Sequence, residues 1–136
     1  MYIKRIKVAN SSIDGKGVFA NESISKGEIV WIFSKGHDFA ITDQEFQNLP
    51  QTKKDHLQHT AYLSPWTKLW VFPPSDDPAE YTNHSTSNNL SVIFDKSVSS
   101  EPYFIANRDI KVGEELTNNY HEFDEATRSA NPDWAK

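Results

Sequence analysis

The chain of 136 residues contains no cysteine. This absence excludes disulfide bonds, thiol nucleophiles and thiolate zinc sites. No stretch approaches the roughly eighteen consecutive apolar residues of a membrane-spanning helix. The N-terminal residues 1–7 alternate polar and apolar side chains and lack the apolar block of a signal peptide. We therefore expect no membrane association and a cytoplasmic location, or a nuclear or host-directed one if the source is eukaryotic, viral or a pathogen.

Basic residues are also fewer than acidic ones. The chain has 14 Lys and Arg against 19 Asp and Glu, which gives a formal net charge of −5. Binding to nucleic acids without sequence preference depends on Lys and Arg that neutralise phosphates, so no direct nucleic-acid partner is expected. An enzyme that acts on a basic peptide fits this charge better.

The residues that are present suffice for one domain with one core. Hydrophobic residues make up 37% of the chain and aromatic residues 12%, and this length normally folds as a single unit. We expect one domain over residues 1–136, with its core from about residue 6 to residue 123. Residues 124–136 form a polar C-terminal tail in which Trp134 is the only large apolar residue.

Local patterns indicate a mainly β fold. Short runs with alternating apolar and β-branched or aromatic residues predict strands at residues 3–8, 27–33, 68–72, 90–94 and 103–107. Clusters of Gly, Pro, Asn and Ser separate them. Thr42 and Glu45 form a capping box that predicts a short helix, and Pro50 favours the start of a second one. Short helices are therefore expected around residues 42–60.

One segment of the chain is echoed later. Residues 19–30 match residues 105–116, each as a strand, an Ala-Asn exit, a buried Ile, a turn with glycine and a returning strand. Gly27 and Gly113 would supply the backbone angles of that turn. The match is either a coincidence between two common strand-turn-strand units or the sign of a pseudo-symmetric β scaffold with functional loops between its halves.

Three polar segments are candidates for chemistry. Glycines in residues 15–19 (Gly-Lys-Gly-Val-Phe) let the backbone approach a ligand, although Asp14-Gly15 is also a common hairpin turn. The second segment is Asn83-His84-Ser85, and the third is residues 113–120, which end on Tyr120. Taken alone, the third reads as an ordinary strand exit with a packing tyrosine. None has the spacing of a phosphate-binding loop.

Two other kinds of site lack essential residues. His56 and His59 are spaced as helical neighbours, but no Cys or second His pair completes a zinc set, so no metal site is expected. A Ser/His hydrolase would normally carry a nucleophile-elbow motif, and the chain has none.

In order and spacing, the three segments resemble those of the SET domain family of protein lysine methyltransferases. That family shows Gly-x-Gly-x-Phe near its start, then Asn-His-Ser-Cys-x-Pro-Asn, and finally Gly-Glu-Glu-Leu-Thr-x-Asp-Tyr. The matching residues here are 15–19, 83–89 and 113–120. The resemblance covers about residues 6–123, and the chain looks like a minimal member without the Cys-rich zinc segments that flank many others.

This resemblance implies a fold more specific than "mainly β". Members of the family form a small β-clip-like assembly of several short sheets. Their C-terminal segment threads under a preceding loop in a knot-like topology, which the usual rules of chain connection disfavour. The threading would bring the Asn83-His84 segment beside Tyr120.

The resemblance also implies a function: transfer of a methyl group from S-adenosylmethionine to the ε-amine of a lysine in a protein or peptide, such as a histone. The backbone around Lys16 and Gly17, together with Asn83 and His84, would hold the cofactor. Tyr120 would contact the cofactor and act as the catalytic residue where the methyl group leaves. Tyr81 and Phe123 are assigned to the substrate channel, and Phe123 or Trp134 would cover the cofactor.

A neutral amine is required for this transfer. At pH 7 a free lysine pays about 4–5 kcal/mol to lose its proton. A sulfonium charge about 4 Å away, at an effective dielectric of about 20, disfavours the ammonium by about 4 kcal/mol, and an aromatic-walled channel acts in the same direction. Tyr120 is therefore expected to orient the amine and not to act as a base.

Four residues depart from the family pattern. Thr86 stands in place of Cys, Asn88 in place of Pro, and Asn118 and Asn119 in place of an aromatic or aliphatic residue and Asp. These changes leave open a degenerate SET domain that serves as an interaction module. A small β domain that binds peptides at a sheet edge is a further alternative. The substrate, the number of methyl groups added and the formation of a homodimer also stay open.

Overall fold

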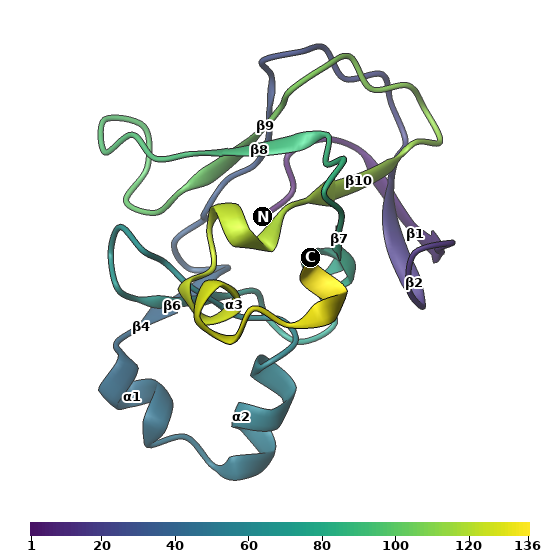
Figure 1. Cartoon of the computed structure of the whole chain (residues 1–136). Helices are drawn as coiled ribbons and strands as arrows, with labels where there is room; N and C mark the ends of the chain where they lie inside the picture. Colours follow the sequence, from purple (N-terminus) through teal and green to yellow (C-terminus); the bar gives the residue numbers. More distant parts are fainter.

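The computed structural model describes all residues from 1 to 136, and the mainly β fold is confirmed (Figure 1). The strands are β1 (Ile6–Asn10), β2 (Lys16–Ala20), β3 (Ile29–Trp31), β4 (Phe39–Ile41), β5 (Tyr62–Leu63), β6 (Trp70–Phe72), β7 (Asn83–His84), β8 (Leu90–Ile93), β9 (Tyr103–Ala106) and β10 (Glu115–Asn118). The helices are α1 (Asp43–Gln47), α2 (Gln51–Leu57) and α3 (Glu125–Ala130), with 3-10 turns η1 (Pro78–Tyr81), η2 (Tyr120–Glu122) and η3 (Asp133–Ala135).

The strands form three small sheets, with orders β1-β2-β10-β7, β3-β9-β8 and β4-β6-β5. All neighbouring strands are antiparallel except β10 and β7, which are parallel. The first sheet therefore joins the first two strands of the chain to the last one. None of the helices has the length and apolarity needed to cross a membrane.

The two echoed segments pair with each other, which confirms the pseudo-symmetric interpretation. Ile24 and Ile110 form an antiparallel bridge and exchange two backbone hydrogen bonds, of 2.9 and 2.8 Å. The N–H groups of Gly27 and Gly113 each donate to the alanine carbonyl of the other segment, both at 2.8 Å. Both glycines have φ near +90°, at 90° and 91°, a conformation that residues with a side chain rarely adopt.

The same symmetry extends to the sheets. The strand that follows the first segment's turn, β3, pairs with β9 of the second segment. The strand that follows the second segment's turn, β10, pairs with β2 of the first. Each half of the scaffold therefore completes the sheet of the other half, and neither sheet can form without both.

Four of the five predicted strands contain an observed strand within their bounds, namely β3, β6, β8 and β9. The fifth, at residues 3–8, overlaps β1 but begins too early. The reason is that the first residues pair with β3 and not with β2: Ile3 N–H donates to the Val30 carbonyl at 2.9 Å, and Tyr2 bridges Trp31. Long-range pairing of this kind leaves no local signal.

The predicted helices are confirmed. Both bonds of the capping box between Thr42 and Glu45 are present at the start of α1, and Pro50 immediately precedes α2. Phe46 of α1 and Leu57 of α2 are buried with Phe72 in a small second cluster. Figure 1 shows α1 and α2 at one end of the molecule, away from β8 and β10.

The main hydrophobic core lies between the sheets. Its most buried members come from both echoed segments and from the strands beside them: Val18, Ala20, Ile24, Val30, Leu90, Ala106, Ile110 and Leu116. Phe123 joins the same core from the C-terminal part of the chain. The domain core boundaries at about residues 6 and 123 stay a prediction.

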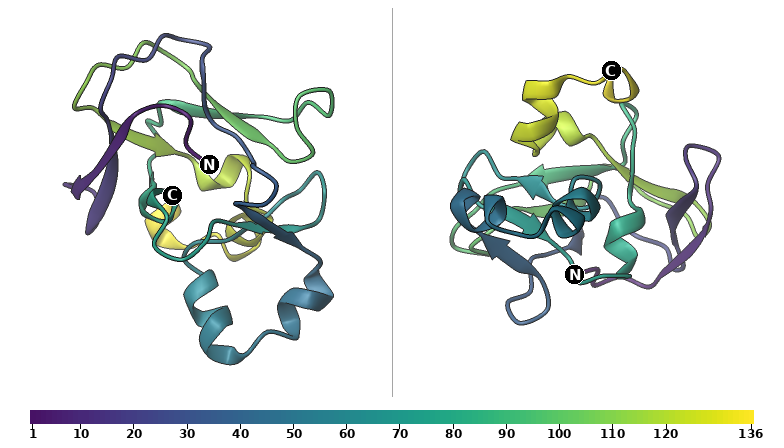
Figure 2. Two further views of the ribbon diagram at one scale, coloured as in Figure 1. Left: turned by 180° about the vertical axis from the view of Figure 1, so that it is seen from behind. Right: turned by 90° about the horizontal axis from the view of Figure 1, so that it is seen from below.

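The C-terminal residues form ordered turns against the rest of the chain. Asp124 caps α3 and is buried, with a relative exposure of 7%. Its Oδ1 accepts from Leu63 N–H at 3.0 Å, which links α3 to β5. Figure 2 shows α3 and η3 standing on one side of the sheets, and in Figure 1 the C-terminus lies beside β7.

Strand β10 is held by a buried side chain as well as by its neighbouring strands. Asn89 is 2% exposed. Its amide nitrogen donates to the Glu115 carbonyl at 2.8 Å, and its Oδ1 accepts from Thr117 N–H at 2.9 Å. The side chain of Asn89 thus satisfies β10 as a neighbouring strand would. The knot-like threading of this segment stays a prediction.

Replacing Asn89 should therefore be costly. In Asn89→Ala both backbone groups of β10 lose their partner in a buried position, and each such group costs about 1–3 kcal/mol. We expect the free energy of unfolding in urea to fall by about 2–5 kcal/mol. Asn48→Ala, at the exposed end of α1, is the matched control and should change it by less than about 1 kcal/mol. Equal effects of the two substitutions would contradict this role for Asn89.

Candidate functional site

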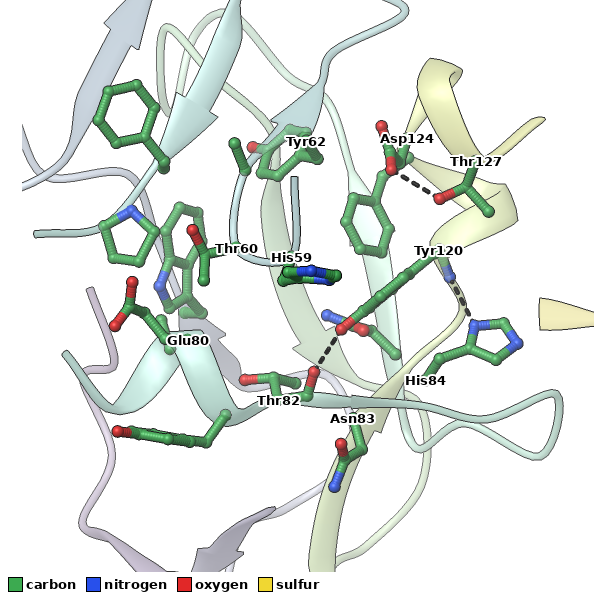
Figure 3. A pocket seen from close by; sticks show the side chains of 18 of the residues that line it. His59, Thr60, Tyr62, Glu80, Thr82, Asn83, His84, Tyr120, Asp124 and Thr127 are labelled. Carbon is green, nitrogen blue, oxygen red and sulfur yellow. Dashed lines mark hydrogen bonds between the residues drawn. The ribbon is translucent and has the colours of Figure 1, made fainter. Parts of the chain in front are cut away.

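A pocket of about 790 Å³ brings the three sequence segments together (Figure 3). Lys16, at the start of β2, lies on its wall, as do Asn83 and His84 of β7 and Tyr120 at the start of η2. The parallel pairing of β7 with β10 places His84 opposite Asn118, two residues before Tyr120. Residues about 100 positions apart in the chain therefore share one cavity.

Tyr120 is fixed by two hydrogen bonds. Its hydroxyl donates to the Thr82 carbonyl at 2.6 Å, and its backbone N–H donates to Nδ1 of His84 at 3.1 Å. Burial raises the pKa of Tyr120 well above its ordinary value of 10.0. The hydroxyl therefore keeps its proton, which points at Thr82, and only its oxygen lone pairs remain for a ligand.

His84 sits at the centre of an aromatic cluster. The rings of Tyr120, His121 and Trp134 approach it edge-on, with centroid distances of 5.4, 6.1 and 5.7 Å. Burial lowers the pKa of His84 from its ordinary value of 6.5, and contact with the backbone of Ala135 partly offsets this effect. Since Nδ1 accepts a hydrogen bond, the neutral ring carries its proton on Nε2, which is buried without a well-formed hydrogen bond.

The Asn83 side chain serves the scaffold. Its amide nitrogen donates to the carbonyls of Asp14 and Lys16, at 3.2 and 3.1 Å, and to Oε2 of Glu115, at 2.8 Å. It therefore ties the β1–β2 hairpin to β10. In Figure 3 the Asn83 amide points away from Tyr120 and His84.

Gly17 is not among the residues that line the pocket. A side chain at this position would collide with the Glu115 carboxylate, since an added Cβ would lie 2.2 Å from Oε2. That carboxylate is itself held by the Ser11 hydroxyl at 2.7 and 2.9 Å. The structure thus gives Gly17 a packing role beneath Glu115, and its contact with a cofactor stays a prediction.

The two residues assigned to the substrate channel both line the pocket, in different settings. Phe123 is 4% exposed and packs edge-on against Tyr120 at 5.6 Å and Phe104 at 4.9 Å. Tyr81 lies nearer to solvent, where its hydroxyl donates to Asp76 at 3.0 Å. The ammonium group of Lys16 lies 6.0 Å from the centre of the Tyr81 ring.

Trp134 forms one wall of the pocket while remaining 61% exposed. Its ring meets Tyr120 edge-on at 5.6 Å, and the neighbouring Ala135 is completely buried. The final turn η3 therefore anchors through Ala135 and extends Trp134 over the cavity. A large, exposed indole in this position has apolar surface available for a ligand.

Residues with unpaired polar atoms concentrate around this pocket. Five residues that line it each have a buried side-chain atom without a hydrogen bond: Trp31 Nε1, Thr60 Oγ1, Tyr62 OH, His84 Nε2 and Asn118 Oδ1. Buried polar groups in folded proteins normally have a partner, and leaving one without costs about 1–3 kcal/mol. These atoms lie behind the surface of the cavity, and a partner reaches them only if the side chains that cover them move.

Sequence patterns missed the wall formed between α2 and β5. His59, Thr60 and Tyr62 line the pocket there, but the sequence predicted only short helices around residues 42–60 and named no cofactor or substrate residue among them. His56 and His59, considered together as possible metal ligands, have separate surroundings: His56 Nε2 pairs with Glu80 at 2.8 Å, while His59 faces the cavity. Only long-range packing brings this loop to Tyr120.

Three of the four departures from the family pattern have a clear place. Asn119 accepts from His121 N–H and caps η2, as Asp would. Asn88 donates to the Leu90 carbonyl at 2.8 Å and so stabilises its own loop. Asn118 is 8% exposed, lines the pocket and keeps its Oδ1 buried without a hydrogen-bond partner. Nothing in the structure explains Thr86.

Comparison with solved structures supports this fold. A mutant Ezh2 chain of the apo Polycomb Repressive Complex 2 from Chaetomium thermophilum matches 93% of this chain with a TM-score of 0.68 and 24% identity. A humanised mutant of that complex, bound to the inhibitor GSK126, matches 92% with a TM-score of 0.62 and 28% identity. The present chain covers 16% of each of those chains.

A smaller structure matches over most of its own length. It is a Plasmodium falciparum protein named as a candidate histone methyltransferase, with a TM-score of 0.55 and 23% identity over 84% of this chain and 90% of that one. None of the curated proteins compared with the chain matches it. The SET domain profile, however, matches residues 15–121, which include all three segments that meet at the pocket. The chain therefore belongs to the SET domain family, a family of protein lysine methyltransferases.

Proposed function

We propose that this chain transfers a methyl group from S-adenosylmethionine to the ε-amine of a lysine in a protein substrate. The observation that carries the proposal is the meeting of Lys16, His84 and Tyr120 in one pocket of about 790 Å³. One of the similar structures is named as a candidate histone methyltransferase, which makes histones a first substrate to test.

The pocket has the groups that such a cofactor needs. The cofactor supplies an electrophilic methyl group when it is bound. The backbone at Lys16, together with β7, would hold its polar parts, and the indole of Trp134 would cover its flat ring. His84 and Asn118 are paired between β7 and β10 and line the same pocket.

Tyr120 would orient the substrate amine. Because its proton is committed to the Thr82 carbonyl, its oxygen can accept a hydrogen bond from an amine N–H. Its raised pKa makes it unsuitable as a proton acceptor at neutral pH, since the anion is disfavoured. The aromatic walls formed by Phe123 and Tyr62 exclude water and favour the neutral amine over the ammonium.

The direct test is incubation with methyl-labelled cofactor, histones and a mixed protein extract, followed by mass spectrometry of the labelled lysines. Calorimetry with S-adenosylmethionine and its demethylated product tests the binding step by itself. Binding with labelled lysines supports the proposal. Absence of both would contradict it and favour an interaction module.

Tyr120→Phe should abolish most of the activity without affecting cofactor affinity. The substitution removes the acceptor that orients the amine, and misplacement of a reacting group costs about 100-fold or more in rate. We expect kcat to fall by at least this factor, while the Kd of the cofactor changes by less than about threefold. Tyr103→Phe, in β9 outside the pocket, serves as the control. Full activity of Tyr120→Phe would contradict this role.

Trp134→Ala should weaken cofactor binding because it removes the exposed wall of the pocket. We expect Kd to rise about tenfold, equivalent to about 1.4 kcal/mol. The same ligand should change the tryptophan fluorescence of the native protein more than that of Trp134→Ala. Trp66→Ala, which removes an indole that is 40% exposed outside the pocket, is the matched control. Equal Kd values for Trp134→Ala and the native protein would rule out this contact.

The folded protein should become less stable in mild acid because of His84. Because the pKa of His84 is lowered in the folded state from its ordinary value of 6.5, the unfolded chain takes up the proton first as the pH falls. The free energy of unfolding should therefore decrease from about pH 6.5 downward, and protonation of Nδ1 would also break the bond from Tyr120 N–H.

Urea unfolding at several pH values between 8 and 5 measures this dependence. His84→Gln should give a flatter profile over the same interval, because the remaining histidines are common to both proteins. Identical profiles for the native protein and the variant would contradict this effect of His84.

A further inference from the structure

A lysine substrate arrives as an ammonium ion, so a proton must leave before methyl transfer. The residue that takes this proton must face the pocket, have no other strong partner and reach solvent. His59 meets these conditions: it lines the pocket, its ring is exposed and it makes no side-chain hydrogen bond. In the view of Figure 3 its ring projects between Tyr62 and Thr82, and it lines the same cavity as Tyr120.

The tyrosines of the pocket are poor proton acceptors. Burial raises the pKa values of Tyr2, Tyr62 and Tyr120 far above 10.0. A hydrogen bond to Asp76 also raises the pKa of Tyr81. All four hydroxyls therefore stay protonated and cannot take up the proton of an ammonium group.

The carboxylates of the pocket are engaged or too weakly basic. Asp124 accepts hydrogen bonds from two backbone N–H groups and from the Thr127 hydroxyl, and it is buried. Glu80 accepts from His56 and from the backbone N–H of Asp76. Asp14 is exposed on the hairpin, but a carboxylate is a much weaker base than an imidazole.

The two remaining charged or titratable groups are also unsuitable. Lys16 is a cation and repels an ammonium ion. His84 already uses Nδ1 to accept from Tyr120 N–H, and burial lowers its pKa, so its ring resists a second proton. His59 is the one imidazole of the pocket without such a commitment.

We propose that His59 accepts the proton that the substrate's ammonium group loses before methyl transfer. The proton moves from the ammonium nitrogen to a ring nitrogen of His59 and then to water, and the amine keeps the lone pair that forms the new N–C bond. Imidazole is suited to accepting and releasing protons near neutral pH. This assignment rests on the proposed methyltransferase function.

The backbone of His59 is held from both sides. Leu57, immediately before this loop, is 1% exposed in the second cluster, and its carbonyl accepts from Thr60 and Ala61 N–H at 3.2 and 2.8 Å. Tyr62 follows in β5 within the main core. The His56–Glu80 contact links the end of α2 to η1. The loop is therefore a firm support, while the His59 ring itself makes no side-chain hydrogen bond and lines the pocket.

A binding experiment tests the contact without catalysis. n-Butylamine, which is an ammonium ion at pH 7 and mimics the end of a lysine side chain, is titrated into the native protein. The ring signals of the histidines are followed by NMR. We expect the His59 signals to shift and those of His56, which lies in α2 outside the pocket, to stay in place. An unmoved His59 ring would overturn the inference.

A kinetic experiment tests the proton transfer. For His59→Gln we expect kcat/KM at pH 7 to fall about 100-fold, the low end of the usual range for a lost acid–base group. The deficit should shrink toward about pH 10, where a lysine amine loses its proton unaided. His56→Gln should keep the native pH profile. A constant deficit at every pH would indicate a purely structural effect and would overturn the inference, and thermal unfolding checks that His59→Gln is folded.

The two proposals fail in different ways. If the native protein methylates lysine but His59→Gln has the native pH profile, the assignment of His59 is wrong and the methyltransferase function stands. If the His59 ring responds to n-butylamine while no substrate is methylated, the amine contact stands and the methyltransferase function is contradicted.

Discussion

The mutual pairing of the two echoed segments is the constraint on which the rest of the structure depends. Ile24 and Ile110 form an antiparallel bridge through their backbones. Each half also contributes a strand to the sheet of the other half. In a domain of this size the sheets are too small to be stable alone. Because β10 must lie against β2 to complete this arrangement, the end of the chain is carried back to its beginning. The pocket forms where these distant segments meet.

Hydrogen bonding around β10 divides scaffold from site. The Asn83 amide donates a hydrogen bond to the Glu115 carboxylate, and the absence of a side chain at Gly17 leaves room for that carboxylate. Asn89 donates to the backbone of β10 from within the core. Few polar groups of these residues lack a hydrogen-bond partner. The residues with unpaired polar atoms gather instead around the pocket. Each such atom carries a free energy cost of about 1–3 kcal/mol until water or a ligand pairs with it.

The chemistry of the pocket follows from how its groups are already engaged. The Tyr120 hydroxyl donates a hydrogen bond to the Thr82 carbonyl, so its oxygen can only accept a further one. Nδ1 of His84 accepts from Tyr120 N–H, so the neutral imidazole carries its proton on Nε2. Burial enforces both states by disfavouring the charged forms. An exposed imidazole on the opposite wall, at His59, is the group that can change its protonation without disturbing this network.

The sequence by itself determined the β class and the helices at Thr42 and Pro50, which follow from local alternation and capping over a few residues. Its resemblance to the SET domain family identified the three segments of the site, and it left the echo of residues 19–30 in residues 105–116 open between coincidence and pseudo-symmetry. Only the tertiary structure decided that Gly17 packs under Glu115 and that the loop with His59 closes the pocket. It also drew Tyr2 and Ile3 to β3 in place of β2. The reason is that contacts between residues far apart in the chain depend on how whole sheets pair, and no short stretch of sequence encodes that pairing.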